Sequence, residues 1–446
     1  MPISRFEEYK KYVLVASQEF FRVETLSSLV MLGCTAVALI LANSPVAESY
    51  TRFWATPITV GIGEHSISKS LLLWINDGLM AIFFLLVGLE IKRETLVGEL
   101  ASFKRAALPI AAAVGGMVAP ALIYLLFNAG QPSARGWGIP MATDIAFALS
   151  VLALLGNRIP HALKIFLSTL AIADDIGATL VIALFYTGQL VWLNLGIAGV
   201  LLASLFVLNA LGVWRPFLYV LIGISLWIAL LKSGVHATLA GIVLAFTIPA
   251  SGRIDADLFL EKSHILLNRF RSSGSAGKHI LTNEEQRAAI LALESACRGA
   301  LPPLSRIEHK LHPWVAFLII PLFALANAGV DFRGSYSVSL VDPVLLGVFL
   351  GLVMGKQAGI TLFAWLAVRC RMATLPSHLT WRHIYGTSWL AGIGFTMALF
   401  ITNIAFLNMP NLLFQAKVGI LLASVVSGAI GFLILRRLSA PPIPHP

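Results

Sequence analysis

The sequence has 446 residues, of which 58% are hydrophobic and only 12% are Asp, Glu, Lys or Arg, and its mean hydropathy is +0.84. A soluble globular protein carries about 25% charged residues, so this composition excludes a soluble enzyme, a disordered protein and a nucleic-acid-binding protein. The three cysteines are too few for a disulfide framework, and no C-x-x-C pair occurs.

Apolar runs of membrane-spanning length recur along the chain. About 20 apolar residues in a helix cross a bilayer. Residues 1–25 lack the short apolar core and cleavage site of a signal peptide, so the first run is expected to be a retained span. The sequence predicts an all-α polytopic membrane protein with about twelve transmembrane helices, at 26–43, 70–90, 106–127, 137–156, 161–187, 191–213, 216–231, 234–250, 313–330, 342–368, 384–407 and 413–435.

Two segments between these runs are not expected to cross the membrane. Residues 57–70 alternate apolar with small or polar side chains, which indicates a short external β-hairpin; the alternative is an irregular loop. Residues 251–312 are polar and contain a Gly/Ser-rich linker and an amphipathic helical stretch near 283–298. The predicted organisation is a cytoplasmic N-terminal segment (1–25), spans 1–8 (26–250), a cytoplasmic loop (251–312), spans 9–12 (313–435) and a cytoplasmic tail (436–446).

The distribution of Lys and Arg sets the orientation, because these residues accumulate on the cytoplasmic side of a membrane protein. With twelve spans both termini lie on one side, and the segments on that side hold 25 of the 32 Lys and Arg residues, against 5 on the other side. Without the loop 251–312 the difference is still 16 against 5. Both termini are therefore expected in the cytoplasm.

Four ionisable residues lie deep inside expected spans. Asp144 is 14 residues before the turn near Arg158 and Asp174 is 16 residues after it, which places both roughly 21–24 Å from that turn. Asp175 is adjacent, and Lys356 is at the centre of its span. An ionisable group at the bilayer centre costs at least a few kcal/mol, so such residues mark an ion path by default.

Helix breaks are expected at the same depth in two spans. One follows Gly136-Trp-Gly-Ile-Pro140, and the other contains Gly392 and Gly394. Irregular backbone at membrane depth is tolerated only where it lines a cavity or a site. Spans 3–5 and 10–12 are two triples of opposite orientation, each with its break in the middle helix. This pattern indicates inverted repeats in a secondary transporter, with the two broken helices crossing at the midplane.

The adjacent pair Asp174–Asp175 indicates the chemistry. Two carboxylates this close cannot both be ionised cheaply, and they titrate as a coupled pair. Na⁺ prefers oxygen ligands and can replace protons as the counter-charge, so competition between Na⁺ and H⁺ for the pair is sufficient for exchange. Lys356 is the expected salt-bridge partner of one aspartate. The alternative is a structural cluster held by Lys356 and the helix ends.

Two other functional classes fit the sequence less well. An intramembrane aspartyl protease uses two aspartates on separate helices, in Tyr-Asp and Gly-x-Gly-Asp contexts that this sequence lacks. A channel would need a carbonyl filter or rings of one charge, and neither is visible. The sequence supports a secondary antiporter best, rather than an enzyme.

Six motifs resemble those of the NhaA-type bacterial sodium/proton antiporters, in the same order along nearly the whole chain outside residues 251–306. They are FFLLVGLEIKRE (83–94), ATDIAFA (142–148), LAIADDIGA (170–178), HPWVA (312–316), PLFALANAG (321–329) and GIGFTM (392–397). This family is an example of inverted-repeat transporters. The resemblance therefore implies the same architecture that the two helix breaks indicate.

The resemblance implies an electrogenic antiporter of the bacterial inner membrane. Such a protein expels Na⁺ or Li⁺ in exchange for a larger number of protons, needs no cofactor, and serves sodium and pH homeostasis and salt tolerance. Asp174 and Asp175 match the family's cation- and proton-binding pair, so Na⁺ is expected there. Thr143 and Asp144 match the unwound helix beside that pair, and Lys356 matches the buried lysine.

The resemblance also implies a response to pH and contacts with partners. The positions that match pH-response residues are Glu90, Glu308, His309 and His312. The alternatives are a snorkelling charge at Glu90 and ordinary histidines at a membrane interface. Glu308 and His312 are four residues apart and can pair on one helix face. The 57–70 hairpin matches a dimer contact, so a second copy of the chain and membrane lipid are the expected partners.

Three further positions carry their own expectations. Gln357 follows Lys356 where the family pattern has proline, which can alter the bend of that helix. The segment 251–306 is several tens of residues longer than in compact members of the family. Asp77, a third of the way into span 2, is expected to cap or bend its helix.

Overall fold

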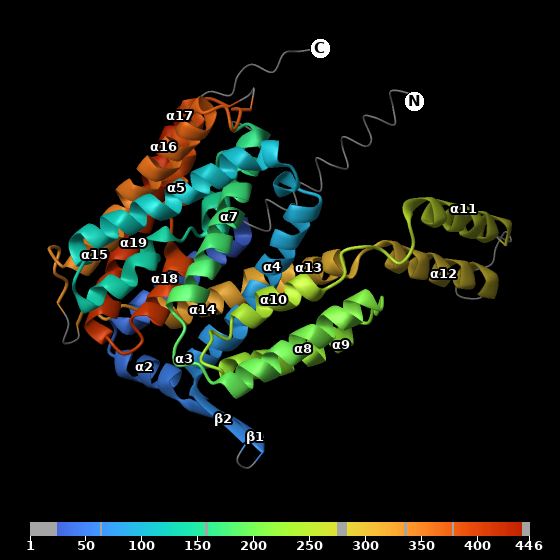
Figure 1. The fold of residues 1–446 in the computed structure, drawn as a ribbon, viewed down its shortest axis with the longest axis horizontal. Coiled ribbons are helices and arrows are strands. Elements are labelled where there is room, and N and C mark those ends of the chain that lie inside the picture. Colours follow the sequence, from blue (N-terminus) through green and yellow to red (C-terminus); the bar gives the residue numbers. More distant parts are fainter. Residues whose placement is uncertain are drawn as a thin grey trace.

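The computed structural model describes residues 25–62, 65–156, 159–273, 283–333, 337–376 and 379–438, which form a helix bundle with one two-stranded sheet (Figure 1). Nine helices in these ranges are long and apolar enough to cross a membrane. They are Thr25–Ala42; α3, η1 and α4 (Leu71–Trp74, Ile75–Leu79 and Met80–Leu96); α5 (Phe103–Asn128); η3 and α6 (Pro132–Met141 and Ile145–Leu154); α7 (His161–Phe185); α8 (Trp192–Ala210); α13, η6 and α14 (Pro303–Trp314, Val315–Ile319 and Ile320–Asn327); α15, η7 and α16 (Pro343–Leu350, Gly351–Gly355 and Lys356–Arg369); and α19 (Pro410–Arg437).

A tenth span and two shorter apolar helices complete the bundle. Helices α17 (Trp381–Ala391) and α18 (Phe395–Ala405) form one span that bends by 45° at the break between them. Helices α9 (Pro216–Leu231) and α10 (Leu239–Thr247), at the positions of expected spans 7 and 8, have 16 and 9 residues. They are shorter than the roughly 20 residues that cross a bilayer. The all-α architecture is confirmed, whereas the count of twelve spans is not.

The predicted hairpin is present. Strand β1 (Pro57–Ile62) pairs antiparallel with β2 (His65–Ser70), with Pro57 opposite Ser70. The hydroxyl of Ser70 accepts a hydrogen bond from the N–H of Leu73, so the last residue of the sheet caps α3. The hairpin follows helix α2 (Ala47–Ala55) and extends from the lower edge of the bundle in Figure 1. We call this end of the bundle the hairpin side and the opposite end the loop side.

The polar segment that begins at 251 contains two helices. Helix α12 (Glu284–Ala300) agrees with the amphipathic stretch predicted near 283–298, whereas α11 (Ala256–Ser272) was not predicted. Its apolar positions are interspersed with Lys, His and Arg, which hides their helical period. The two helices pack on each other and extend away from the bundle (Figure 1). Helix α13 begins at Pro303, so the helix of span 9 starts ten residues before the expected boundary at 313.

The site region depends on a close approach of spans 3 and 10. Helices α5 and α16 meet at Gly115 and Gly359, where a Cβ added to either glycine would lie within 2.2 Å of the other residue's carbonyl oxygen. Only glycine permits this backbone contact, because any side chain would separate the helices. The next residue of α5, Gly116, leaves space beside the side-chain stem of Lys356. The packing therefore brings Lys356 against span 3 in the middle of the bundle.

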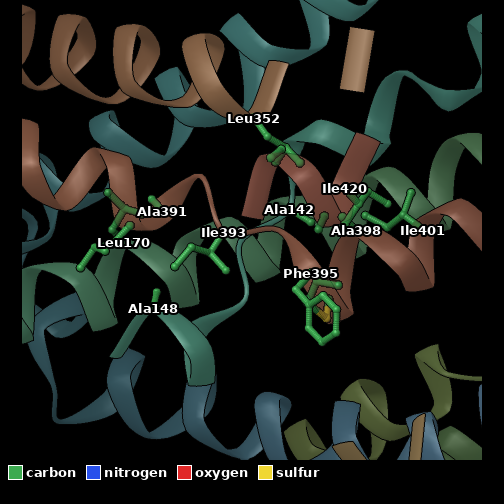
Figure 2. Packing of buried hydrophobic residues seen from close by; sticks show 14 of the residues in the cluster. Ala142, Ala148, Leu170, Leu352, Ala391, Ile393, Phe395, Ala398, Ile401 and Ile420 are labelled. Carbon is green, nitrogen blue, oxygen red and sulfur yellow. The ribbon is translucent and has the colours of Figure 1, made fainter. Parts of the chain in front are cut away.

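Buried apolar side chains surround the two helix breaks (Figure 2). Ala142 and Ile393 lie on the two interrupted segments, and Leu170 and Ala391 pack beside them. All four are at most 1% exposed. The crossing is thus held within a closely packed core, which fixes the polar groups described next.

Candidate ion-binding site

The two broken helices cross and bond to each other through their backbones. Span 4 leaves helical geometry at Ala142–Asp144, between η3 and α6, and span 11 at Gly392–Gly394. The N–H of Asp144 donates to the carbonyl of Ile393 over 2.7 Å. A Cβ at Gly392 would lie 2.6 Å from the carbonyl oxygen of Leu352, so close approach rather than a left-handed φ requires this glycine. The predicted crossing is confirmed.

Asp144 lies between the N-termini of α6 and α18. Its carboxylate accepts from the N–H of Phe147 at 3.0 Å, and from the N–H and hydroxyl of Thr396 at 3.0 and 2.6 Å. Helix N-termini carry partial positive charge, which an acidic side chain stabilises. Both carboxylate oxygens of Asp144 are therefore engaged in holding the crossing together, and the two helix ends supply its counter-charge.

Asp174, on α7, is paired with the buried lysine. The ammonium of Lys356 bonds to Oδ2 of Asp174 in a contact that is wholly buried on both sides, and it donates to the hydroxyl of Thr143 at 2.9 Å. The Thr143 hydroxyl lies 2.7 Å from Oδ2 of Asp174 and 2.9 Å from the carbonyl of Ala391, and it can donate to either. The expected ion pair is thus formed, and the broken helices supply its neighbouring hydroxyl.

Asp175 has different surroundings, although it follows Asp174 directly. It is 2% exposed, forms no ion pair within the described residues, and its Oδ1 is buried without a hydrogen-bond partner there. It lines a cavity of about 70 Å³ together with Asp144, Glu90, His312 and Thr396, among apolar side chains. Successive residues on a helix point about 100° apart, and this rotation directs one carboxylate to Lys356 and the other to the cavity.

The four predicted pH-response residues lie in different places. Glu90 and His312 line the cavity with Asp175. Glu308 is buried and forms an ion pair with Arg93 of α4 at 2.5 Å, which joins it to another helix. His309 is exposed. The structure therefore brings only two of the four next to the aspartates.

Two features of the site were not recognised in the sequence, and neither were the surroundings of a third, Gln357. Thr396 binds Asp144, and it is the second residue of α18, two positions after Gly394 of the break. The turn Gly351–Gly355 before Lys356 is a π-helix, a local irregularity that ends two residues before position 357, where proline was expected. Gln357 is buried, and its Oε1 lacks a hydrogen-bond partner among the described residues.

The position of Asp77 agrees with its expected structural role. It lies within the π-helical turn η1, pairs with Lys69 of the hairpin at 2.6 Å, and its carbonyl accepts from the indole of Trp227. It is therefore separate from the aspartate pair. Within the described residues, no three His, Cys, Asp or Glu side chains converge on a point that could hold a metal ion. In this conformation the aspartates do not form a closed cation cage.

Comparison with known proteins gives a consistent result. The family described as Na⁺/H⁺ antiporter 1 matches residues 18–435. A "Na(+)/H(+) antiporter NhaA" from Koribacter versatilis is 52% identical over 94% of this chain and 91% of its own length. A "Na(+)/H(+) antiporter NhaA 2" from Syntrophotalea carbinolica is 49% identical over 95% and 96%. A "Na(+)/H(+) antiporter NhaA 1" from Klebsiella pneumoniae is 47% identical over 94% and 96%.

Proposed function

The chain belongs to the Na⁺/H⁺ antiporter 1 family and is a sodium/proton antiporter, a secondary transporter rather than an enzyme, and we propose that Asp175 is the carboxylate at which Na⁺ and H⁺ compete. One observation supports this assignment above the others. Among the residues that the structure describes, Asp175 is a buried acid that faces the cavity without an ion pair, whereas Asp174 and Asp144 have counter-charges there.

Burial without a counter-charge favours the protonated carboxyl group. Na⁺ entering the cavity supplies the missing charge at Asp175, and the proton leaves. Na⁺ is cargo, and it needs more oxygen ligands than one carboxylate offers. Asp174 is the nearest second carboxylate, but its charge is already satisfied by Lys356. Na⁺ binding by both carboxylates therefore requires the ammonium to lose its proton or to move to another acceptor. Thr143 lies beside both groups and can accept that bond.

We infer that the exchange is electrogenic on this basis. If Asp175 and the Asp174–Lys356 pair together release more than one proton for each Na⁺, every cycle moves net positive charge inward. One charge crossing 100 mV is worth about 2.3 kcal/mol. An inside-negative potential then drives Na⁺ out even without a pH difference, and Li⁺, a hard cation of the same charge, is the expected alternative cargo.

A current measurement tests this proposal. Proteoliposomes on a solid-supported membrane receive a Na⁺ concentration jump at equal pH on both sides. We expect a transient current that reverses with the direction of the Na⁺ gradient and disappears in Asp175→Asn. Exchange that is intact in a pH-gradient dye assay but produces no current would mean electroneutral exchange and would contradict the proton count.

The proposed orientation places the hairpin side outside and the loop side in the cytoplasm of a bacterial inner membrane. The supporting observation is the excess of Lys and Arg on the loop side. Glu90 and His312 are the proposed pH-response residues next to the aspartates, because changes in their charge act on Asp175 across the shared cavity. The ion pair of Glu308 with Arg93, and the exposed His309, complete the proposed pH-response set on the loop side.

We also propose that two copies of the chain associate through the hairpin, among membrane lipid. The hairpin extends from the bundle, and the side chains of Ile58 and Val60 are exposed on its first strand. A two-stranded sheet has free edges that can pair with another strand. Cross-linking of a single cysteine at position 60 in the membrane, compared with one at exposed position 207, tests the contact; equal cross-linking of both would argue against it.

A further inference from the structure

Two layers of matched side chains lie toward the hairpin side from the cavity of Asp175. Spans 2, 9 and 11 each contribute one buried phenylalanine and one buried asparagine. The phenylalanines are Phe84, Phe323 and Phe400, and the asparagines are Asn76, Asn327 and Asn403. The centroid of the Phe400 ring lies 5.3 Å from that of Phe84 and 6.4 Å from that of Phe323.

The asparagines bond to one another around a central member. Asn327 donates to Oδ1 of Asn76 at 2.9 Å. In return, Oδ1 of Asn327 accepts from the amides of Asn76 at 3.3 Å and Asn403 at 2.7 Å. The amide of Asn327 also bonds to the carbonyl of Phe323 in its own helix. Each of the three buried amides thus belongs to a different span. Moving one span away breaks the hydrogen bonds between its asparagine and the others.

Helix α18 lines two cavities, one on each side of these layers. Thr396 and Met397 of α18 face the cavity of Asp175. Phe400 and Asn403 of α18 face a second cavity of about 250 Å³ on the hairpin side, together with Asn76. Thr396 and Phe400 are one helical turn apart, which is about 6 Å along the axis. About one turn of α18 therefore separates the two cavities, and Phe400, Asn403 and Asn76 of these layers lie at the wall of the second one.

We propose that Asn76, Asn327 and Asn403 form the latch of an external gate, which must open for an ion to leave Asp175 toward the hairpin side. The proposal rests on the proposed function, because it assumes that Asp175 binds the transported ion. The aromatic layer excludes water and ions. The amide layer holds spans 2, 9 and 11 together in the closed arrangement, and when it separates, its carboxamide oxygens become ligands for a passing monovalent cation.

Thiol accessibility tests the latch. In a chain with Cys34, Cys297 and Cys370 replaced by Ser, Met397→Cys places a reporter one turn behind the aromatic layer. A charged, membrane-impermeant thiol reagent is added from the hairpin side, and the labelling rate is measured by mass spectrometry. Asn327→Leu keeps the volume of the side chain but removes the amide bonds. We expect it to raise the labelling rate at least about tenfold, because it removes the three hydrogen bonds that join Asn327 to Asn76 and Asn403.

Matched variants separate a latch from a general loss of structure. Asn128→Leu removes another buried amide, which bonds the carbonyls of Tyr124 and Pro343 in span 3 and span 10, and it should leave the labelling rate unchanged. Asn403→Leu removes only the bond to Asn327 and replaces Asn327→Leu if that variant does not insert. It should raise the rate by a smaller factor.

Exchange is measured in the same vesicles with a pH-gradient dye. Labelling at the unmodified rate in Asn327→Leu or Asn403→Leu, in vesicles that exchange Na⁺ for H⁺, would overturn the latch and leave the proposed function intact. An equal rise in Asn128→Leu would also overturn it. Exchange that persists in Asp175→Asn of the same cysteine-substituted chain, whatever the labelling rates, would instead contradict the proposed function.

Discussion

Asp174 and Asp175 are neighbours on α7, yet in the described part of the chain only Asp174 has a cationic side chain bonded to it. On one side of the helix, Lys356 and Thr143 bond to Asp174 in a fully buried contact. On the other side, Asp175 faces a cavity shared with Glu90 and His312. The difference shows how adjacent acids on one helix can have separate tasks, because a 100° rotation places them in separate electrostatic environments.

The two sides of α7 have different roles in transport. On the side of Asp174, losing one partner of the ion pair destabilises the fold, since it leaves an uncompensated buried charge. The cavity side carries the exchangeable charge. Substitutions on the first side should therefore change stability and transport together, whereas substitutions on the second should change transport alone.

The largest expected effect is functional. Asp175→Asn removes the carboxylate that faces the cavity, so Na⁺-driven dequenching of a pH-gradient dye in everted vesicles should fall to background. Its unfolding temperature in detergent should stay near wild type, because no ion pair, and no hydrogen bond to Oδ1, joins Asp175 to the other described residues. Asp342→Asn, a helix-cap residue of α15 far from the cavity, is the control and should exchange normally, since Asn also caps helices. Normal exchange by a well-expressed Asp175→Asn protein would show that Asp175 is not the carboxylate at which Na⁺ and H⁺ compete.

Lys356→Met should have the largest effect on stability. It leaves Asp174 buried without its cation, and such a loss costs about 3–5 kcal/mol of unfolding free energy. Protonation of Asp174 reduces this cost, so the loss should be smaller at low pH. Thermal unfolding in detergent at two pH values measures it. The double variant Asp174→Asn with Lys356→Met removes both charges and should regain most of the stability. If Lys356→Met were as stable as wild type at both pH values, the ion pair would not contribute to the stability of the fold.

A smaller effect is expected where spans 3 and 10 meet. Gly359→Ala adds a methyl group about 2.0 Å from the carbonyl oxygen of Gly115, so the helices must separate. Overpacking of this kind costs about 1–3 kcal/mol and displaces Lys356 from Asp174. Gly199→Ala on α8 has open space around it and should not destabilise the protein. Equal unfolding temperatures for the two variants would show that this close approach does not set the position of Lys356.

The smallest effect should come from the loop side. Arg93→Gln removes the partner of Glu308, and because Arg93 is 42% exposed the pair is worth only about 0.2–1 kcal/mol. Maximal exchange should be retained, while the pH at half-maximal exchange should shift. Arg105→Gln, whose ion pair with Glu99 is separate from Glu308, serves as the control. An unchanged pH profile in Arg93→Gln would remove this pair from the proposed pH response.

Much of this site could be predicted from the sequence. The common depth of Asp144, Asp174 and Lys356 follows from the rise per residue of a helix. Gly392 and Gly394 indicate the break in span 11. Two properties could not be derived from residue order. The choice of Asp174 over Asp175 as the partner of Lys356 depends on the rotation of α7, which tertiary packing sets. Likewise, the pairing of Glu308 with Arg93 joins helices that are distant in the sequence.

Fold boundaries show a similar division. The hairpin and α12 have clear local patterns and were predicted correctly. The start of α13 at Pro303 was missed, because a polar first helical turn on the loop side looks like the loop that precedes it. The lengths of α9 and α10 depend on how the chain packs around Ser233 and Gly234, where Gly188 and Val191 bond to the turn between them. Hydropathy alone does not contain that information.

Calorimetric titration with Na⁺ in detergent, repeated in buffers of different ionisation enthalpy, counts the protons released for each Na⁺ bound and is the most direct test of the division between the two aspartates. We predict that the wild-type protein releases more than one proton and that Asp175→Asn gives no Na⁺-dependent heat at any pH. We further predict that Asp174→Asn, which leaves Lys356 without its carboxylate partner but keeps Asp175, still binds Na⁺, weakly and with fewer protons released. Sodium binding by Asp175→Asn with wild-type proton release would contradict the account.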